Sequence, residues 1–155
     1  MPVKRSAGLL VHRRRGESVE VFIVHPGGPY WRNKDDGAWS LPKGEYGEDE
    51  DALTGARREF LEETGIEIEG EFTPLQPVRL TGGKLVQAWA VPGDFEAATI
   101  KSNTFAIEWP PRSGRMQSFP EVDRGGWFTL KTAAIKLVRG QRPLLDELRQ
   151  LLTGV

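Results

Sequence analysis

The residues best suited to chemistry are glutamates between Gly44 and Ile66. Glu59, Glu62 and Glu63 stand at i, i+3 and i+4, so a helix over residues 51–64 places their side chains on one face. Like charges at this spacing cost a helix about 0.2–0.5 kcal/mol per pair, and more when they are shielded from water. Because a bound divalent cation reverses this repulsion, the spacing predicts a metal site.

The same segment carries the signals that fix such a helix. Leu53, Ala56 and Phe60 recur at i, i+3 and i+7, which predicts an apolar stripe that packs on the rest of the protein. Acidic residues 49–51 lie where the positive end of the helix dipole would be, and Gly65 follows the last helical residue. The helix is therefore predicted to be anchored, with its carboxylates facing away from the core.

Residues 44–66 resemble the Nudix box, whose pattern is Gly-x5-Glu-x7-Arg-Glu-U-x-Glu-Glu-x-Gly-U, with U a bulky aliphatic residue. Every fixed polar and glycine position matches, and Phe60 stands where Ile, Leu or Val is usual. That position lies on the predicted buried face, so the change is expected to affect packing more than chemistry. The resemblance implies metal-dependent hydrolysis of a phosphoanhydride bond in a nucleoside diphosphate linked to another group.

The resemblance also assigns roles to residues of the box. It implies Mg2+ or Mn2+ held by carboxylate and carbonyl oxygens, which are the ligands that such hard cations prefer. Arg58 is expected to pair with the acidic residues and to fix their rotamers. The implied ligands are Glu59, Glu62, Glu63 and the backbone carbonyl of Lys43, with Glu50 as a supporting group or an additional ligand.

Two carboxylates are candidates for the general base. Nudix enzymes use either a glutamate of the box, here Glu59, or one from a later loop. Glu121 precedes Trp127 by six residues, and similar diadenosine tetraphosphate hydrolases have a glutamate at that spacing that reaches the metal site. Asp123 is its nearest competitor, and a solvated loop residue is the alternative interpretation of Glu121.

The residues before the box narrow the resemblance. The segment Trp39-x-x-Pro42-Lys43-Gly44 resembles the dinucleoside polyphosphate and RNA 5′-pyrophosphate branches, in which a lysine occupies the position of Lys43. An ammonium group close to a phosphate chain is chemically apt, so Lys43 is predicted to bind substrate. The alternative is a solvated lysine beside an acidic helix.

Residues 101–117 combine cations, aromatic rings and turn residues. Arg112 and Arg115 have planar guanidinium groups suited to phosphate oxygens, and Trp109, Phe119, Tyr30 or Trp31 could supply a ring that stacks on a base. The two arginines, Trp109 and Tyr30 are the predicted substrate contacts. The alternative is a surface loop pinned to the core by its aromatic rings. His12 and His25 show no metal-ligand spacing and are interpreted as structural.

The order of predicted elements indicates an α/β sandwich with a mixed sheet and helices on both faces, and the family resemblance implies an α/β/α sandwich. A single Nudix domain is predicted over residues 1–155. Predicted strands cover residues 7–12, 19–25, 72–80, 84–91 and 127–130, and predicted helices cover 51–64, 132–138 and 143–152.

The composition and charge of the sequence limit the classes of molecule that it is expected to bind. A net charge of −1 argues against broad electrostatic binding of duplex nucleic acid and leaves a nucleotide-type small molecule as the expected substrate. The sequence has no apolar run long enough to span a membrane. Because it has no cysteine, a cytoplasmic location is the expectation. The oligomeric state is left open.

Two functions are compatible with the box. The first is a pyrophosphohydrolase acting on a nucleoside or dinucleoside polyphosphate. The second is a catalytically inactive Nudix-fold module that senses a nucleotide. Arg58, Glu59, Glu62 and Glu63 are all present, which favours catalysis, since a sensor has no need for intact ligands. The group linked to the diphosphate is not specified by the box.

Overall fold

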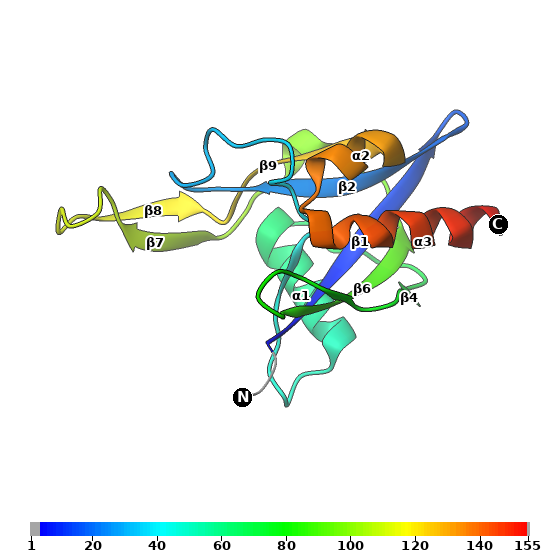
Figure 1. Ribbon diagram of the computed structural model, residues 1–155, viewed down its shortest axis with the longest axis horizontal. Helices are drawn as coiled ribbons and strands as arrows, with labels where there is room; N and C mark the ends of the chain where they lie inside the picture. The colour runs from blue at the N-terminus through cyan, green and yellow to red at the C-terminus, as the bar shows by residue number, and fades with distance from the viewer. Residues whose placement is uncertain (1–3, 155) are drawn as a thin grey trace.

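A computed structural model describes residues 4–154 (Figure 1). A seven-stranded mixed sheet lies between α1 on one face and α2 and α3 on the other, which confirms the predicted α/β/α sandwich. The sheet strands are β1 (Arg5–Arg15), β2 (Ser18–Pro26), β3 (Lys43–Glu45), β4 (Thr73–Pro74), β5 (Val78–Arg79), β6 (Leu85–Pro92) and β9 (Val122–Thr129). The helices are α1 (Ala52–Thr64), α2 (Leu130–Lys136) and α3 (Arg142–Thr153), with short 3-10 turns at Ala97–Thr99 and Arg139–Gln141.

β1 is the central strand that positions the site. It runs parallel to β6 along most of its length, and it pairs antiparallel with β2 through residues 12–15 and with β3 through residues 6–8. The main path of the sheet is β4-β6-β1-β2-β9. The short β3, which enters the box, is therefore held beside the N-terminal half of the central strand.

Side chains on β1 alternate between two cores. Leu9 and Val11 pack in the cluster that contains Phe60 of α1, whereas Leu10 packs in the cluster that contains Leu148 of α3. This is the period of two expected of a strand buried on both faces. Phe60 is fully buried, so the prediction that its position belongs to the packing face is confirmed.

The predicted signals at the ends of α1 are confirmed. The side chain of Asp51 accepts a hydrogen bond from the backbone N–H of Thr54 at 3.2 Å, which caps the first turn. Gly65 adopts φ 73° and donates its N–H to the carbonyl of Leu61 at 2.7 Å, which ends the helix in a left-handed residue that glycine favours. No helix within residues 4–154 is long and apolar enough to cross a membrane.

Three predicted elements differ in the structure. The predicted strand 72–80 is split into β4 and β5, because Pro74 and Pro77 lack the N–H that a continuous ladder needs. The predicted strand 127–130 is the end of β9, which starts at Val122, and Leu130 already begins α2. Residues 101–117, for which no strand was predicted, contribute to an antiparallel hairpin of β7 (Thr104–Glu108) and β8 (Met116–Pro120).

Candidate active site

Carboxylates from α1 and from a distant loop line one hollow of about 460 Å3. It opens between β3, the last turns of α1 and the base of the β7–β8 hairpin. Its lining residues are Lys43, Gly44, Glu45, Glu59, Glu62, Glu63, Lys84, Asn103 and Glu121. The structure thus brings together the three predicted metal ligands of the helix, the predicted base Glu121 and Lys43. Their roles in chemistry stay predictions.

The absence of a side chain at Gly44 leaves room for the Glu59 carboxylate. A Cβ added at Gly44 would overlap the carboxyl carbon and both oxygens of Glu59. The carboxylate therefore lies directly against the backbone of β3, where only glycine leaves room for it. The side chain of Glu59 is 16% exposed, so it is shielded from water and still open to the hollow.

Arg58 fixes the positions of three glutamate side chains through hydrogen bonds. Its guanidinium donates to both oxygens of Glu50 at 2.9 and 3.0 Å, to Glu59 Oε1 at 2.9 Å and to Glu62 Oε1 at 3.2 Å. Nη2 also donates to the backbone carbonyl of Glu45 at 3.2 Å. The hydrogen bonds to Glu50, followed by those to the other two glutamates, raise the pKa of Arg58 above its ordinary value.

Glu50 lies outside the residues that line the hollow. Both of its oxygens are bound by Arg58, and this hydrogen bonding lowers the pKa of its carboxyl. Of the two roles expected of Glu50, the arrangement favours the supporting one. Glu50 fixes Arg58, and Arg58 in turn orients Glu59 and Glu62.

Without a bound cation, the hollow favours the protonated form of its buried carboxyl groups. Burial, followed by the charges of Glu59 and Glu121, raises the pKa of the Glu63 carboxyl from 4.5 to about 8, against the opposing effect of Lys43. Burial also raises the pKa of Glu59, and the charges of Glu62 and Glu121 act in the same direction. Burial and the neighbouring Lys84 lower the pKa of Lys43.

These donors suit a hard divalent cation. Carboxylate oxygens are the ligands that Mg2+ and Mn2+ prefer, and the glycine at position 44 keeps a space that a larger residue would fill. Within residues 4–154, no three acidic, histidine or cysteine side chains are already gathered as a ligand set, and Arg58 holds one oxygen each of Glu59 and Glu62. The second oxygen of each carboxylate is the one suited to a cation, together with Glu63 and the Lys43 carbonyl.

We expect the metal-free protein to lose stability as the pH rises from 5 to 8. The Glu63 carboxyl has a pKa of about 8 in the folded state and about 4.5 in the unfolded chain. The folded state therefore binds more protons between these values, so the free energy of unfolding falls with rising pH across this window. Mg2+ replaces the proton, so its gain in melting temperature is expected to be larger at pH 8 than at pH 5.

Melting curves with and without Mg2+ at both pH values measure this. The Glu63→Gln variant is the control, because it lacks the titrating carboxyl and should show a flatter dependence on pH in the metal-free state. A melting temperature that is independent of Mg2+ at pH 8 would contradict the metal assignment.

Glu121 is held at the rim of the hollow by its backbone. Its N–H donates to the carbonyl of Asn103 at 2.9 Å, and its carbonyl accepts from the N–H of Gly27 at 2.9 Å. The side chain is exposed to the hollow. Asp123 points elsewhere, since its Oδ1 lies 2.9 Å from Nδ1 of His25. Of the two loop carboxylates considered, only Glu121 lines the hollow.

His25 is buried and connects two loops. One ring nitrogen lies 2.9 Å from Asp123 Oδ1, and the other lies 2.6 Å from the backbone carbonyl of Lys34. The edge of the ring meets Trp39 at a centroid distance of 5.4 Å. These contacts fit the structural role predicted for His25, which ties the segment after β2 to the start of β9.

The predicted substrate contacts of the hairpin lie apart from the carboxylates. Trp109 packs edge-on against Tyr30 at a centroid distance of 5.2 Å, and Arg112 and Arg115 lie in the turn between β7 and β8. None of the four lines the hollow, and Figure 1 shows the hairpin extending away from the body of the protein.

Three lining residues were missed in the sequence, namely Glu45, Lys84 and Asn103. Glu45 is the second residue of the box and follows Gly44 on β3. Lys84 follows the Gly82-Gly83 turn and reaches the hollow because β6 runs beside β1. No local signal marks Asn103, whose position depends on pairing with residue 121.

A second hollow, of about 310 Å3, lies along another side of α1. It is lined mainly by apolar groups and by the stems of Arg57 and Arg58, with Leu61 and Ile68 among its walls. It holds no cluster of carboxylates, since Glu67 is the only acidic residue that lines it. We therefore place the candidate chemistry in the carboxylate-lined hollow.

A mixed sheet lies between helices, and glutamates from the end of α1 gather in one hollow. Residues 2–148 match the NUDIX domain, and the chain belongs to the Nudix hydrolase family. It is 31% identical over 152 residues to an RNA pyrophosphohydrolase of Bartonella henselae, covering 85% of this chain and 79% of that protein.

Solved structures share the fold. The Ap4A hydrolase of C. elegans, in a binary complex, aligns with a TM-score of 0.65 at 22% identity over 99% of this chain and all of that one. The NUDIX domain of Shewanella oneidensis NrtR, complexed with ADP ribose, aligns with a TM-score of 0.69 at 17% identity over 99% and 90% of the two chains. At these identities the likeness supports the fold alone.

Proposed function

We propose that the protein is a divalent-metal-dependent pyrophosphohydrolase that cleaves a phosphoanhydride bond in a nucleoside or dinucleoside polyphosphate. The observation that carries the proposal is the convergence of Glu59, Glu62, Glu63 and Glu121 with Lys43 in one hollow. Carboxylates bind cations and accept protons, and an ammonium group binds phosphate oxygens. A site that cleaves a phosphate chain needs all three capacities.

Each residue has a task in this proposal. A divalent cation such as Mg2+ or Mn2+, held by these residues, would polarise the phosphate and lower the pKa of the attacking water. Glu59, Glu62, Glu63 and the carbonyl of Lys43 are the proposed ligands, and Glu121 at the rim is the proposed general base. The ammonium groups of Lys43 and Lys84 lie in the same hollow and are proposed to bind phosphate oxygens.

Space for the rest of a nucleotide adjoins the hollow. A smaller hollow of about 180 Å3 shares Lys43, Glu63 and Glu121 with the first and extends along Val24 and Leu41. The relative that is 31% identical is an RNA pyrophosphohydrolase, which supports a substrate with a chain of phosphates. A cytoplasmic location fits such substrates and stays a prediction.

The sensing module is the competing function. A sensor binds the nucleotide and has no need of an ordered acidic cluster. Here Arg58 orders the glutamates with four hydrogen bonds to three carboxylates, and Glu121 faces them across the hollow. This arrangement favours catalysis.

A substrate panel tests the proposal. Dinucleoside polyphosphates, nucleoside triphosphates, ADP-ribose, diphosphoinositols and 5′-triphosphorylated RNA would be incubated with Mg2+ and with Mn2+, and released phosphate or nucleotide would be measured. We expect hydrolysis of at least one phosphate-chain substrate, and loss of it on removal of the metal. Tight binding of a nucleotide without turnover of any panel member would support the sensor instead.

We expect Glu121→Gln to lower kcat by about 100-fold and to leave KM within about twofold, because removal of a general base affects the chemical step. Steady-state kinetics with the best substrate of the panel measure both constants. Glu96→Gln, an exposed carboxylate away from the hollow, is the control for the change of charge. An unchanged kcat in Glu121→Gln would move the base to Glu59.

A further inference from the structure

The β7–β8 hairpin forms an arm, defined here as residues 104–120. Its strands pair with each other and, within residues 4–154, with no strand of the main sheet. Figure 1 shows the arm projecting from the sandwich, with the segment after β2 lying along it. An isolated two-stranded hairpin is marginally stable in water, so the arm depends on that segment for support.

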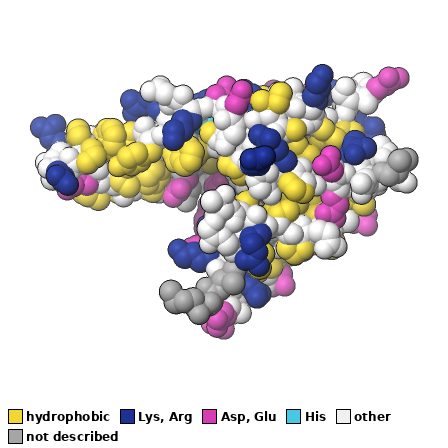
Figure 2. Space-filling view, viewed as in Figure 1, with side chains coloured by type: hydrophobic (Ala, Val, Ile, Leu, Met, Phe, Trp, Pro, Cys, Tyr) yellow, Lys and Arg dark blue, Asp and Glu magenta, His cyan; other side chains and the backbone are white. Residues whose placement is uncertain are grey.

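Aromatic side chains line the junction of the arm and the segment 27–34. Phe105 packs over Gly28, which has φ 97° and no room for a Cβ, and Trp109 meets Tyr30 edge-on. Tyr30 is nevertheless 60% exposed and Trp31 is 40% exposed. Figure 2 shows apolar side chains gathered along the arm. Exposed rings that are already held in place can stack on planar groups at little entropic cost.

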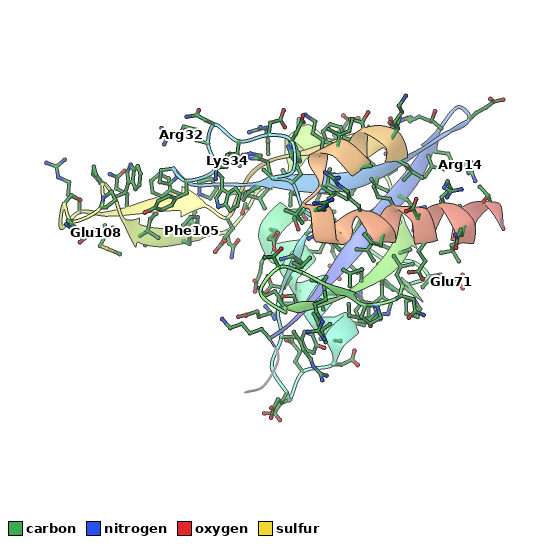
Figure 3. The ribbon with its side chains drawn as sticks, viewed as in Figure 1. Arg14, Arg32, Lys34, Glu71, Phe105 and Glu108 are labelled. Atoms are coloured by element: carbon green, nitrogen blue, oxygen red, sulfur yellow. The ribbon has the colours of Figure 1, made fainter. Side chains whose placement is uncertain are left out.

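Cations surround these rings. Arg32, Lys34, Arg112 and Arg115 form no ion pair with a carboxylate in the part of the chain that the structure describes. Lys34 instead lies over the ring of Trp31 at 5.1 Å. Figure 3 places Arg32 and Lys34 on the loop beside the arm, and Figure 2 shows basic side chains at its tip.

Two acidic residues in or next to the same segments bind groups other than the charged side chains of these cations. Glu108 accepts the backbone N–H of Arg112 at 2.8 Å, which fixes the turn. Asp35 binds Lys136 at 2.8 Å and the indole N–H of Trp39 at 2.8 Å. The guanidinium groups of the tip therefore stay available for an anionic partner, although the whole chain has a net charge of −1.

The arm is continuous with the carboxylate hollow. Asn103 and Glu121 flank its base, are joined by a backbone hydrogen bond of 2.9 Å, and both line the hollow. β7 has five residues, so the tip lies about 17 Å beyond the base at about 3.3 Å per residue. A mononucleotide with its phosphates in the hollow does not reach that far, whereas a longer strand does.

We propose that the arm and the segment 27–34 bind single-stranded nucleic acid, holding the nucleotides that follow a 5′ phosphate chain placed in the hollow. The partner chemistry is that of a flexible strand, in which exposed bases stack on Tyr30 and Trp31 and backbone phosphates meet the arginines. The inference rests on the proposed function and extends it by naming the group linked to the phosphates.

Binding is tested without hydrolysis. Labelled single strands of RNA and of DNA, each of about 12 nucleotides with a 5′-hydroxyl, cannot be cleaved at a phosphate chain, and fluorescence anisotropy measures their Kd. We expect the double variant Arg112→Gln, Arg115→Gln to raise Kd about tenfold and to lower the slope of log Kd against log salt by about 1.4, at about 0.7 per phosphate contact. Separate RNA and DNA probes show which strand is preferred.

The control removes two cations elsewhere. Arg14→Gln with Lys131→Gln makes the same change of net charge at exposed positions off the arm, and Figure 3 shows Arg14 at the opposite end of the molecule. This variant is expected to keep the Kd of the parent protein. The proposal would be overturned by an equal loss of affinity for the strand in the two double variants, or by a parent protein that binds neither RNA nor DNA.

Kinetics separate this inference from the proposed function. With a 5′-triphosphorylated strand as substrate, the arm variant should raise KM about tenfold, and KM for a mononucleoside triphosphate should stay within about twofold. An equal rise in KM for mononucleoside or dinucleoside substrates would overturn the proposal that the arm binds a nucleic-acid strand. Absence of hydrolysis with every substrate refutes the proposed function, whereas the anisotropy result tests the arm by itself. A dimer that dissociates on Met116→Lys would assign the arm to a second copy instead, since Met116 is 68% exposed on it.

Discussion

Replacing Glu63 by glutamine is expected to lower kcat by about 10³-fold while raising the melting temperature of the metal-free protein at pH 8. The loss arises because a ligand that contributes several kcal/mol to stabilising charge in the transition state is removed, and each 1.36 kcal/mol is tenfold in rate. The gain arises because Glu63 is a shielded carboxyl beside Glu59 and Glu121, with a pKa raised to about 8, so its charge opposes folding at that pH.

Opposite signs in activity and stability distinguish a ligand from a packing residue. Steady-state rates with Mg2+ and melting curves in a chelator measure the two effects. Glu71→Gln is the matched control, because Glu71 is exposed and lies outside the hollow. A folded Glu63→Gln protein with nearly full activity would exclude Glu63 as a ligand. A lower melting temperature in the chelator would show that the carboxylate stabilises the fold.

The helix of the box could be predicted in detail because its determinants are local. The apolar stripe, the cap at Asp51 and the left-handed Gly65 each depend on neighbours within four residues, and each is present in the structure. The alternation on β1 is equally local, although the sequence alone does not reveal that β3 and β6 flank this strand. Pairing between distant strands decides which residues face the helix.

The rest of the site depends on such distant pairing. Lys84 comes to the hollow through β6, and Glu121 comes to it through backbone bonds with Gly27 and Asn103. The resemblance to related hydrolases pointed to Glu121 by its spacing, whereas no periodic pattern marks Lys84. The network around Arg58 was expected in kind, and its link to both oxygens of Glu50 required the structure.

The β7–β8 hairpin was not predicted, although its local signals are present in the sequence. Phe105, Ile107 and Trp109 alternate as in a strand, and the turn residues of 110–114 follow them, so the signal of a hairpin is present. Arg112 and Arg115 were predicted to bind phosphate oxygens of the substrate, and no strand was predicted in this segment. The paired strands instead carry Arg112 and Arg115 outward, away from the carboxylates.

The second large effect is expected at Gly44. Its φ is not in the left-handed region, so alanine is compatible with the backbone, yet a Cβ there would occupy the position of the Glu59 carboxyl group. The flexible glutamate can swing aside, so Gly44→Ala should shift the melting temperature by only about 3 °C, which corresponds to about 1 kcal/mol. Activity should fall about 100-fold, because a displacement of about 1 Å in a reacting group has that effect.

Gly47→Ala is the matched control, since nothing lies within 4 Å of a Cβ at that position of the same segment. Steady-state kinetics and melting curves of the two variants compare a filled space with an open one. Glu59→Asp shortens the side chain and leaves room for a Cβ at position 44. In that variant, Gly44→Ala should lower activity by a smaller factor than in the parent protein, and this non-additivity identifies the contact. Equal activity of Gly44→Ala and Gly47→Ala would show that the position of the Glu59 carboxylate against β3 has no part in catalysis.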